Sequence, residues 1–227
     1  MSSPPRFPMI SADRVALEKL GRAVRARLDA DPAAHKIPVD GAEIYAFGKF
    51  LTPAECQRFM AMVDQVAQPS STFDQGRAST YRTSWSGDVD PGDPFVRMIE
   101  RRLNDLLGIA PEWGETIQGQ RYQPGQEFKP HHDWFYTNAP YWAAEASRGG
   151  QRSWTAMIYL SDVAEGGETT FPHVGATVTP EQGALLVWNN AGRDGTPNGD
   201  TIHAALPVVR GVKYVITKWY RTRRWGH

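Results

Sequence analysis

The second half of the chain is a succession of short segments with β-strand propensity, separated by glycine, proline and asparagine. About eight such runs with turn signals between them favour an antiparallel sandwich or jelly roll. No helix-length apolar pattern interrupts them, which argues against a parallel sheet built from alternating strands and helices. The expected strands are Ile117–Gln123, Gln126–Asp133, Trp154–Ser161, Glu168–Phe171, Ala176–Thr179, Ala184–Trp188, Thr201–Leu206 and Lys213–Arg221.

The first half carries three helical patterns. Apolar residues of the segment 11–30 recur at three- and four-residue spacing, which is typical of an amphipathic helix. The run Thr52–Glu55 predicts the start of a second helix, because a capping threonine, a proline and a glutamate follow in the order of a capping box. Asp93–Pro94 predicts the start of a third. We expect these helices to pack their apolar faces on the β-sheet core and to buttress it.

The length of 227 residues suits a single domain, which we expect to span 1–227. Residues 1–110 would supply mostly helical support, and 111–222 the β core. Two stretches, 68–92 and 137–151, are polar and lack periodicity, which predicts long loops. Long loops in a compact domain are often functional.

Composition excludes several classes of protein. Lys plus Arg and Asp plus Glu each number 25, and this neutral balance argues against a nucleic-acid partner, which requires a basic surface. Cys56 is the only cysteine, so neither a disulfide framework nor a cysteine-rich zinc site is possible within the chain. The sequence contains no run of about 18 apolar residues, which a membrane span would need. Residues 1–9 also lack the apolar stretch of a signal peptide. We therefore expect a cytoplasmic protein without a membrane partner.

A candidate metal site lies at the end of one predicted strand. His131 and Asp133 flank His132, and on a strand the side chains at i and i+2 share a face while i+1 points away. His203, on another predicted strand, would complete a set of two imidazoles and one carboxylate. That facial set leaves coordination positions open and is diagnostic of non-haem Fe(II) oxygenases.

Two further residues suit an acidic co-substrate beside that metal. Lys213 opens an otherwise apolar strand, where its ammonium can either reach the rim of the barrel or meet the far carboxylate of a 2-oxo dicarboxylate. The other end of such a molecule can chelate a metal through two oxygens. Tyr122 could add a hydroxyl donor to the same carboxylate.

The order of several motifs resembles one known family, the prolyl 4-hydroxylase branch of the Fe(II)/2-oxoglutarate dioxygenases. The resemblance covers about residues 43–222 in this sequence. Its blocks are Tyr81–Ser84, Arg121–Gln126, Pro130–Phe135, Thr155–Ser161, Gly166–Pro172, His203–Val208, Gly211–Lys213 and Lys218–Trp219.

The resemblance implies a fold, a set of cofactors and roles for single residues. The fold would be mainly β, a double-stranded β-helix of the jelly-roll type with α-helices packed on one sheet. His131, Asp133 and His203 match the iron ligands of the family, and no other catalytic residue is implied. Lys213 matches the partner of the distal carboxylate of 2-oxoglutarate. Tyr122, Tyr159 and Thr169 match further positions of the co-substrate pocket.

The resemblance also implies the reaction. An enzyme of this kind uses Fe(II), 2-oxoglutarate and O2, with ascorbate as an auxiliary, to hydroxylate an unactivated C–H bond and release succinate and CO2. We expect a prolyl residue of a peptide or protein as the substrate. Arg82 and Trp85 in one predicted loop, and Tyr141 and Trp142 in the other, could contact it, since flat aromatic faces suit a proline ring.

Three alternatives stay open at this point. The same chemistry could act on a free amino acid or another small molecule. A cupin-like barrel could hold the metal without turnover, although such a module has no need of a buried cation facing a dicarboxylate. A zinc hydrolase would also use two histidines and a carboxylate, but no general-base glutamate stands in the H-E-x-x-H arrangement.

Overall fold

The computed structural model describes residues 13–70 and 80–226. Four α-helices and two short 3-10 helices lie among these residues. They are α1 (Arg14–Ala30), α2 (Pro53–Val66), α3 (Pro94–Leu107), α4 (Trp142–Ser147), η1 (Pro111–Trp113) and η2 (Gly199–Thr201). No described helix combines the length and apolar character that crossing a bilayer requires.

Fourteen strands of the described residues form two facing sheets and a small ribbon, and every pairing is antiparallel. The larger sheet has the order β1 (His35–Lys36), β2 (Ile44–Phe47), β11 (Leu185–Asn189), β7 (Arg152–Tyr159), β14 (Lys213–Arg221), β5 (Gln118–Tyr122), β4 (Trp85–Asp88) and β3 (Gln68–Pro69). The smaller sheet has the order β10 (Ala176–Val178), β9 (Thr169–Phe171), β12 (His203–Ala205) and β6 (Phe128–His131). The ribbon pairs β13 (Val208–Arg210) with β8 (Glu165–Gly166).

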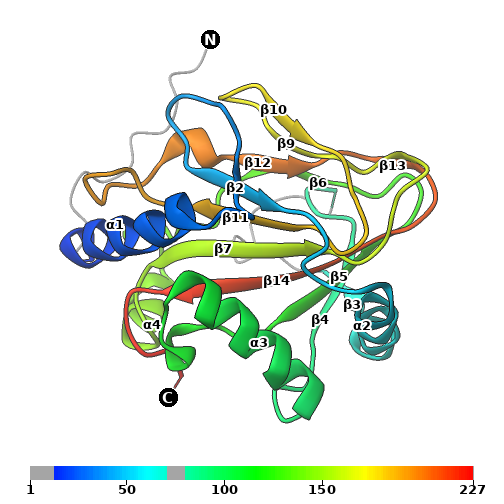
Figure 1. The fold of residues 1–227 in the computed structure, drawn as a ribbon, viewed down its shortest axis with the longest axis horizontal. Helices are drawn as coiled ribbons and strands as arrows, with labels where there is room; N and C mark the ends of the chain where they lie inside the picture. Colours follow the sequence, from blue (N-terminus) through cyan, green and yellow to red (C-terminus); the bar gives the residue numbers. More distant parts are fainter. Residues whose placement is uncertain (1–12, 71–79, 227) are drawn as a thin grey trace.

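The two sheets enclose one apolar layer, and the helices enclose another. Side chains of β2, β5, β7 and β11 meet those of β9 and β12 between the sheets, as Phe171 and Trp188 do with ring centroids 5.6 Å apart. On the opposite face of the larger sheet, α1, α2 and α3 bury their apolar stripes (Figure 1). The expected jelly-roll double-stranded β-helix buttressed by helices is therefore confirmed.

Local sequence chemistry accounts for where the supporting helices begin and how closely they pack. The Thr52 hydroxyl accepts from the N–H of Glu55, whose carboxylate accepts from the N–H of Thr52, which is the predicted capping box of α2. Asp93 caps α3 in the predicted place. Gly119 on β5 lets α2 approach, because a Cβ there would lie 2.4 Å from Cγ2 of Val63.

Two predictions about local structure are wrong. The strand predicted to reach Asp133 ends at His131. Farther along, the backbone of Phe135 pairs with the Gln151 side chain, whose amide oxygen accepts from the Phe135 N–H at 3.0 Å and whose NH2 group donates to the Phe135 carbonyl at 2.6 Å. The stretch 137–151, predicted as a loop, contains α4. Its alanines favour a helix, and its Glu145 is held by the Arg221 guanidinium at 2.5 Å.

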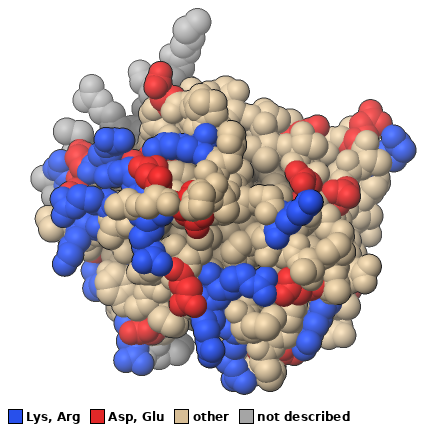
Figure 2. Space-filling model, viewed as in Figure 1, with Lys and Arg blue, Asp and Glu red and all other residues tan. Residues whose placement is uncertain are grey.

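Part of the other predicted loop, 68–92, forms β-strands instead. Its flanks pair as β3 and β4 at the edge of the larger sheet, while residues 71–79 lie outside the described residues. On the molecular face shown in Figure 2, acidic side chains adjoin the groups of basic ones. This mixture matches the neutral net charge.

Candidate metal centre and co-substrate pocket

A cavity lies between the two sheets. The lining combines three possible metal ligands, two cations and several aromatic rings. The lining residues are Arg82, Gln120, Tyr122, Phe128, His131, Asp133, Met157, Thr169, Trp188, His203, Ala205, Lys213, Val215, Thr217 and Trp219.

The three predicted metal ligands converge at this cavity. His131 on β6 and His203 on β12 are paired in register, and their ring centroids lie 4.2 Å apart. Asp133 follows β6, and its Oδ2 lies 3.9 Å from Nε2 of His203. One ligand atom from each residue lies within 4.8 Å of the others. Sheet pairing thus brings together two stretches that are far apart in the sequence.

A hydrogen bond at Nδ1 orients each of the two imidazole rings. Nδ1 of His131 lies 2.8 Å from the carbonyl of Lys129, and Nδ1 of His203 lies 3.0 Å from the carbonyl of Thr201. A carbonyl only accepts, so in the neutral imidazole each Nδ1 carries the proton and each Nε2 keeps a lone pair. Burial, reinforced by the neighbouring His203, holds the pKa of His131 well below its usual value. His131 is therefore neutral at physiological pH, as metal binding requires.

The donor set fits Fe(II). Two imidazole nitrogens and one carboxylate form the facial set of the non-haem iron oxygenases. Nδ1–H bonds to backbone carbonyls are a usual way in which proteins fix metal-binding histidines. The same cavity is also lined by Lys213.

Lys213 supplies a buried cation to the same cavity. Its side chain is 1% exposed, and its ammonium donates to Oγ1 of Thr169 at 3.3 Å. The rings of Tyr122 and Tyr159 lie 5.4 and 5.5 Å from Nζ. Among the described residues, no carboxylate lies within 4.0 Å of this ammonium. Burial lowers the pKa of Lys213 to about 7, against the opposing field of Glu168. An anionic ligand would supply the missing partner.

The other predicted co-substrate residues surround this lysine to different degrees. Tyr122 is paired with Lys213 across β5 and β14, and its hydroxyl donates to Oε1 of Gln120 at 2.8 Å. Thr169 lines the cavity on β9. Tyr159 does not line it, but its hydroxyl donates to Oγ1 of Thr169 at 2.7 Å. Tyr159 therefore acts on the cavity through Thr169.

Of the residues expected to contact a substrate, only Arg82 lines the cavity. Its guanidinium donates to Ser84 Oγ at 3.1 Å and to Gln118 Oε1 at 3.0 Å, and it lies 4.9 Å from the centre of the Phe128 ring. Burial lowers its pKa, while Tyr122 and Asp133 oppose that effect.

Three aromatic residues expected to contact a substrate lie away from the described cavity lining. Trp85 on β4 has the Arg121 guanidinium 5.6 Å from its ring centre. Tyr141 accepts from the N–H of Tyr136 at 3.3 Å, and Trp142 begins α4. The predicted substrate contacts of Trp85, Tyr141 and Trp142 stay predictions.

Several lining residues were not singled out by sequence. Gln120 and Tyr122 are two residues apart on β5, and Lys213 and Thr217 four apart on β14, so each pair shares a face. Gln120 also donates to the Thr217 hydroxyl at 3.2 Å. The alternation of side chains along β5 and β14 was the signal that could have identified Gln120 and Thr217. Trp219, the last residue of the blocks that resemble the family, lines the cavity as well.

A jelly roll with two histidines, a carboxylate and a buried lysine around one cavity defines the class of 2-oxoglutarate-dependent iron oxygenases. Comparison with known proteins supports the same class. The family model of the 2OG-Fe(II) oxygenase superfamily matches residues 117–221.

Individual relatives narrow this class. Prolyl 4-hydroxylase 1 of Arabidopsis thaliana is 35% identical over 195 residues, which cover 77% of this chain and 67% of that protein. Probable prolyl 4-hydroxylase 8 of the same plant is 32% identical, with coverage of 80% and 69%. The structure of a viral collagen prolyl hydroxylase from Paramecium bursaria Chlorella virus-1, in complex with 2OG, superposes with a TM-score of 0.63 at 25% identity, covering 82% of this chain and 99% of that one. The chain belongs to the prolyl 4-hydroxylase family of 2-oxoglutarate-dependent iron oxygenases.

Proposed function

We propose that this protein hydroxylates a prolyl residue of a peptide or protein substrate and converts 2-oxoglutarate and O2 to succinate and CO2. The single observation that carries the proposal is the sharing of one cavity by the three convergent ligands and the buried ammonium of Lys213. The family relationship supports the prolyl substrate, since the relatives are named as prolyl 4-hydroxylases.

The residues of the cavity divide into two groups. His131, Asp133 and His203 would hold iron through two imidazole nitrogens and one carboxylate. Bound iron, with 2-oxoglutarate and O2, supplies the oxidising chemistry: one oxygen atom enters the substrate C–H bond and the other enters succinate as CO2 leaves. Lys213 would pair with the distal carboxylate of 2-oxoglutarate, and Thr169 and Tyr122 beside it can add hydrogen bonds.

The walls of the cavity give the protein control over water and orientation. Phe128, Met157 and Trp219 present apolar surface to the cavity. Such surface excludes water, which strengthens the pairing of an ammonium with a carboxylate. Aromatic faces also suit the apolar ring of a prolyl residue. Arg82, which lines the same cavity, would donate a hydrogen bond to a peptide carbonyl.

The test is turnover on defined peptides. The protein is incubated with Fe(II), 2-oxoglutarate, ascorbate and proline-containing peptides, and both succinate and products that have gained one oxygen on proline are measured by mass spectrometry. We expect equal amounts of succinate and hydroxyproline, and loss of both in Asp133→Ala. Turnover of free proline or another small molecule without any peptide product would replace the peptide substrate with a small one.

The same assay distinguishes the proposed enzyme from a cupin-like metal-binding module. A cupin-like module would bind metal but neither bind 2-oxoglutarate nor release succinate, whatever prime substrate is offered. Arg193→Gln is the control, because it removes an exposed positive charge outside the cavity lining and should leave turnover unchanged. A cytoplasmic location stays a prediction.

A further inference from the structure

Asp133 is the one proposed ligand that no strand holds. His131 and His203 are fixed by the pairing of β6 with β12 and by their Nδ1 hydrogen bonds. Asp133 lies two residues beyond the end of β6, so the sheet does not determine the direction of its carboxylate. Something else must orient it.

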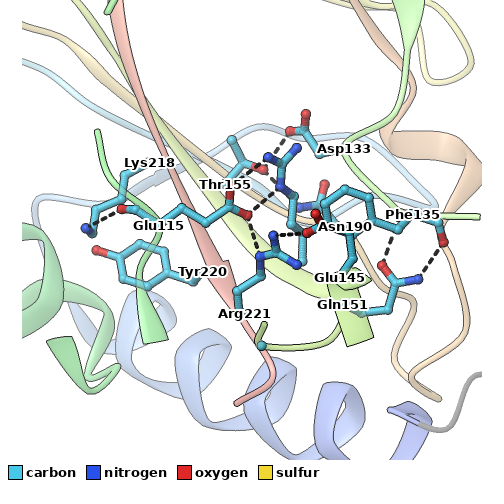
Figure 3. Close-up of polar contacts among 12 residues, drawn as sticks. Glu115, Asp133, Phe135, Glu145, Gln151, Thr155, Asn190, Lys218, Tyr220 and Arg221 are labelled. Atoms are coloured by element: carbon cyan, nitrogen blue, oxygen red, sulfur yellow. Dashed lines mark hydrogen bonds and ion pairs between the residues drawn. The ribbon is translucent and has the colours of Figure 1, made fainter. Parts of the chain in front are cut away.

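A buried chain of two hydrogen bonds reaches the carboxylate from the larger sheet. The Thr155 hydroxyl on β7 donates to Oδ2 of Asp133 at 2.7 Å. The side-chain amide of Asn190 donates to the Thr155 oxygen at 2.9 Å. Figure 3 shows Asn190, Thr155 and Asp133 in this order. All three side chains are buried.

The chemistry of the groups fixes the direction of this chain. A carboxylate only accepts, so the single hydrogen of the Thr155 hydroxyl must point at Asp133. The oxygen of Thr155 is then available to accept, and the Asn190 amide group is the donor that occupies it. Asn190 thereby holds the hydroxyl in the rotamer that bonds Asp133, and this bond restrains Oδ2 of the carboxylate.

The backbone of Asn190 connects the same residue to the other ligand strand. Its carbonyl accepts from the N–H of Asn198 at 3.1 Å, and the Asn198 carbonyl accepts from the Thr201 hydroxyl at 2.8 Å. The Thr201 carbonyl in turn accepts from Nδ1 of His203. Asn190 therefore belongs to both hydrogen-bond chains, the one that ends at Asp133 and the one that ends at His203.

We propose that Thr155 and Asn190 are positioning residues for the metal site, with Asn190 acting on Asp133 through the Thr155 hydroxyl. The inference rests on the proposed function in one respect, that the three ligands bind a divalent metal. Neither residue contributes a ligand atom. Partners of metal-binding side chains typically change metal affinity about 10–100-fold when they are removed.

The experiment measures Mn²⁺ binding rather than turnover. Free Mn²⁺ is followed by electron paramagnetic resonance as it is titrated with each protein. We expect Thr155→Val to weaken binding about 10–100-fold and Thr155→Ser, which keeps the hydroxyl, to stay within about 3-fold of the wild type. Asn190→Ala should weaken binding, and adding it to Thr155→Val should change the affinity little further, since the two act through one hydroxyl.

A matched control separates positioning from general loosening of the fold. Ser153 lies on the same strand, and its buried hydroxyl donates to the Tyr220 carbonyl at 2.9 Å, away from the ligands. Ser153→Ala should lower the urea midpoint without changing Mn²⁺ affinity. Equal Mn²⁺ affinity of Thr155→Val and wild type, or fully additive effects of Thr155 and Asn190 changes, would overturn the proposal.

The outcome also distinguishes this inference from the proposed function. If wild type binds Mn²⁺, Asp133→Ala does not, and Thr155→Val binds as wild type does, only the positioning role is lost. If Asp133→Ala binds as wild type does, the ligand assignment itself fails, and the positioning role fails with it. Should Thr155→Val not fold, Asn190→Ala decides alone, because it leaves the Thr155 hydroxyl in place.

Discussion

Lys213→Met should stabilise the protein while weakening its proposed 2-oxoglutarate site. The Lys213 ammonium is buried in the free protein, with one hydrogen bond from its Nζ to Thr169 and no carboxylate partner among the described residues. Methionine fills a similar volume without a charge. Because burying an uncompensated charge destabilises a fold, its removal should raise the free energy of unfolding.

The pKa of Lys213 gives the size of the effect. Burial lowers that pKa from 10.5 to about 7. At roughly 1.4 kcal/mol for each pH unit, the folded protein loses on the order of 5 kcal/mol below pH 7 relative to an unshifted lysine. Relaxation of the cavity and water entry reduce this cost, so we expect a gain of about 2–4 kcal/mol for the methionine variant at neutral pH.

The pH dependence has a definite sign. Between pH 7 and 10.5 the unfolded lysine carries a proton that the folded one has lost. The unfolded state then binds more protons, so wild-type stability from this group rises with pH. The advantage of Lys213→Met should therefore be largest at and below pH 7 and shrink by up to about 1.4 kcal/mol per pH unit above it.

Urea unfolding of the metal-free protein, followed by tryptophan fluorescence from about pH 6 to about pH 9, measures this difference. Lys218→Met is the control: Lys218 is also buried, but its ammonium contacts Glu100 at 2.7 Å, so its loss should destabilise. A Lys213→Met variant less stable than wild type at pH 7, or a difference independent of pH, would refute the reasoning.

Three further predictions concern the same cavity and the charges behind it. The dissociation constant of 2-oxoglutarate, measured by calorimetry, should be constant below pH 7 and rise toward tenfold per pH unit above it. The reason is that the pKa of Lys213 is about 7, so above that pH the lysine must take up a proton when 2-oxoglutarate binds. A dissociation constant that does not change up to about pH 9 contradicts this. Glu115→Gln should cost about 3–5 kcal/mol in urea unfolding, since Glu115 pairs with buried Arg152 at 2.7 Å and Arg221 at 2.5 Å; a loss below about 1 kcal/mol would show that the pairs are not compensating each other. Asp133→Ala should abolish Mn²⁺ binding, whereas Lys213→Ala should keep it and raise the 2-oxoglutarate requirement, and equal metal affinities of these two variants would contradict the division of roles.

Much of the fold was predictable because local rules and tertiary packing agree. The apolar runs predicted β5, β7, β11 and β14 nearly at their observed ends, since these strands are buried between layers. The capping box at Thr52 fixed the start of α2. Short strands such as β8 and β13 carry too few residues for any periodicity, so only their pairing defines them.

The three proposed metal ligands were singled out for a partly wrong reason. The sequence argument placed His131 and Asp133 on one face of a strand, but Asp133 lies beyond the strand and accepts a hydrogen bond from Thr155. Sequence spacing could not show this, because Thr155 and Asn190 reach Asp133 only after distant strands pair. Lys213 was predictable as an odd cation in an apolar strand, while Gln120 depended on knowing which face of β5 is turned inward.

The most direct test of the account is an anaerobic titration of the Fe(II)-loaded protein with 2-oxoglutarate. A 2-oxo acid that chelates Fe(II) through two oxygens produces a visible charge-transfer band, which reports both the metal and its co-substrate in one site. We predict a saturable band at one equivalent in the wild type, a band requiring much more 2-oxoglutarate in Lys213→Met, and none in Asp133→Ala. A wild-type protein that binds Fe(II) yet develops no band at any 2-oxoglutarate concentration would contradict the account.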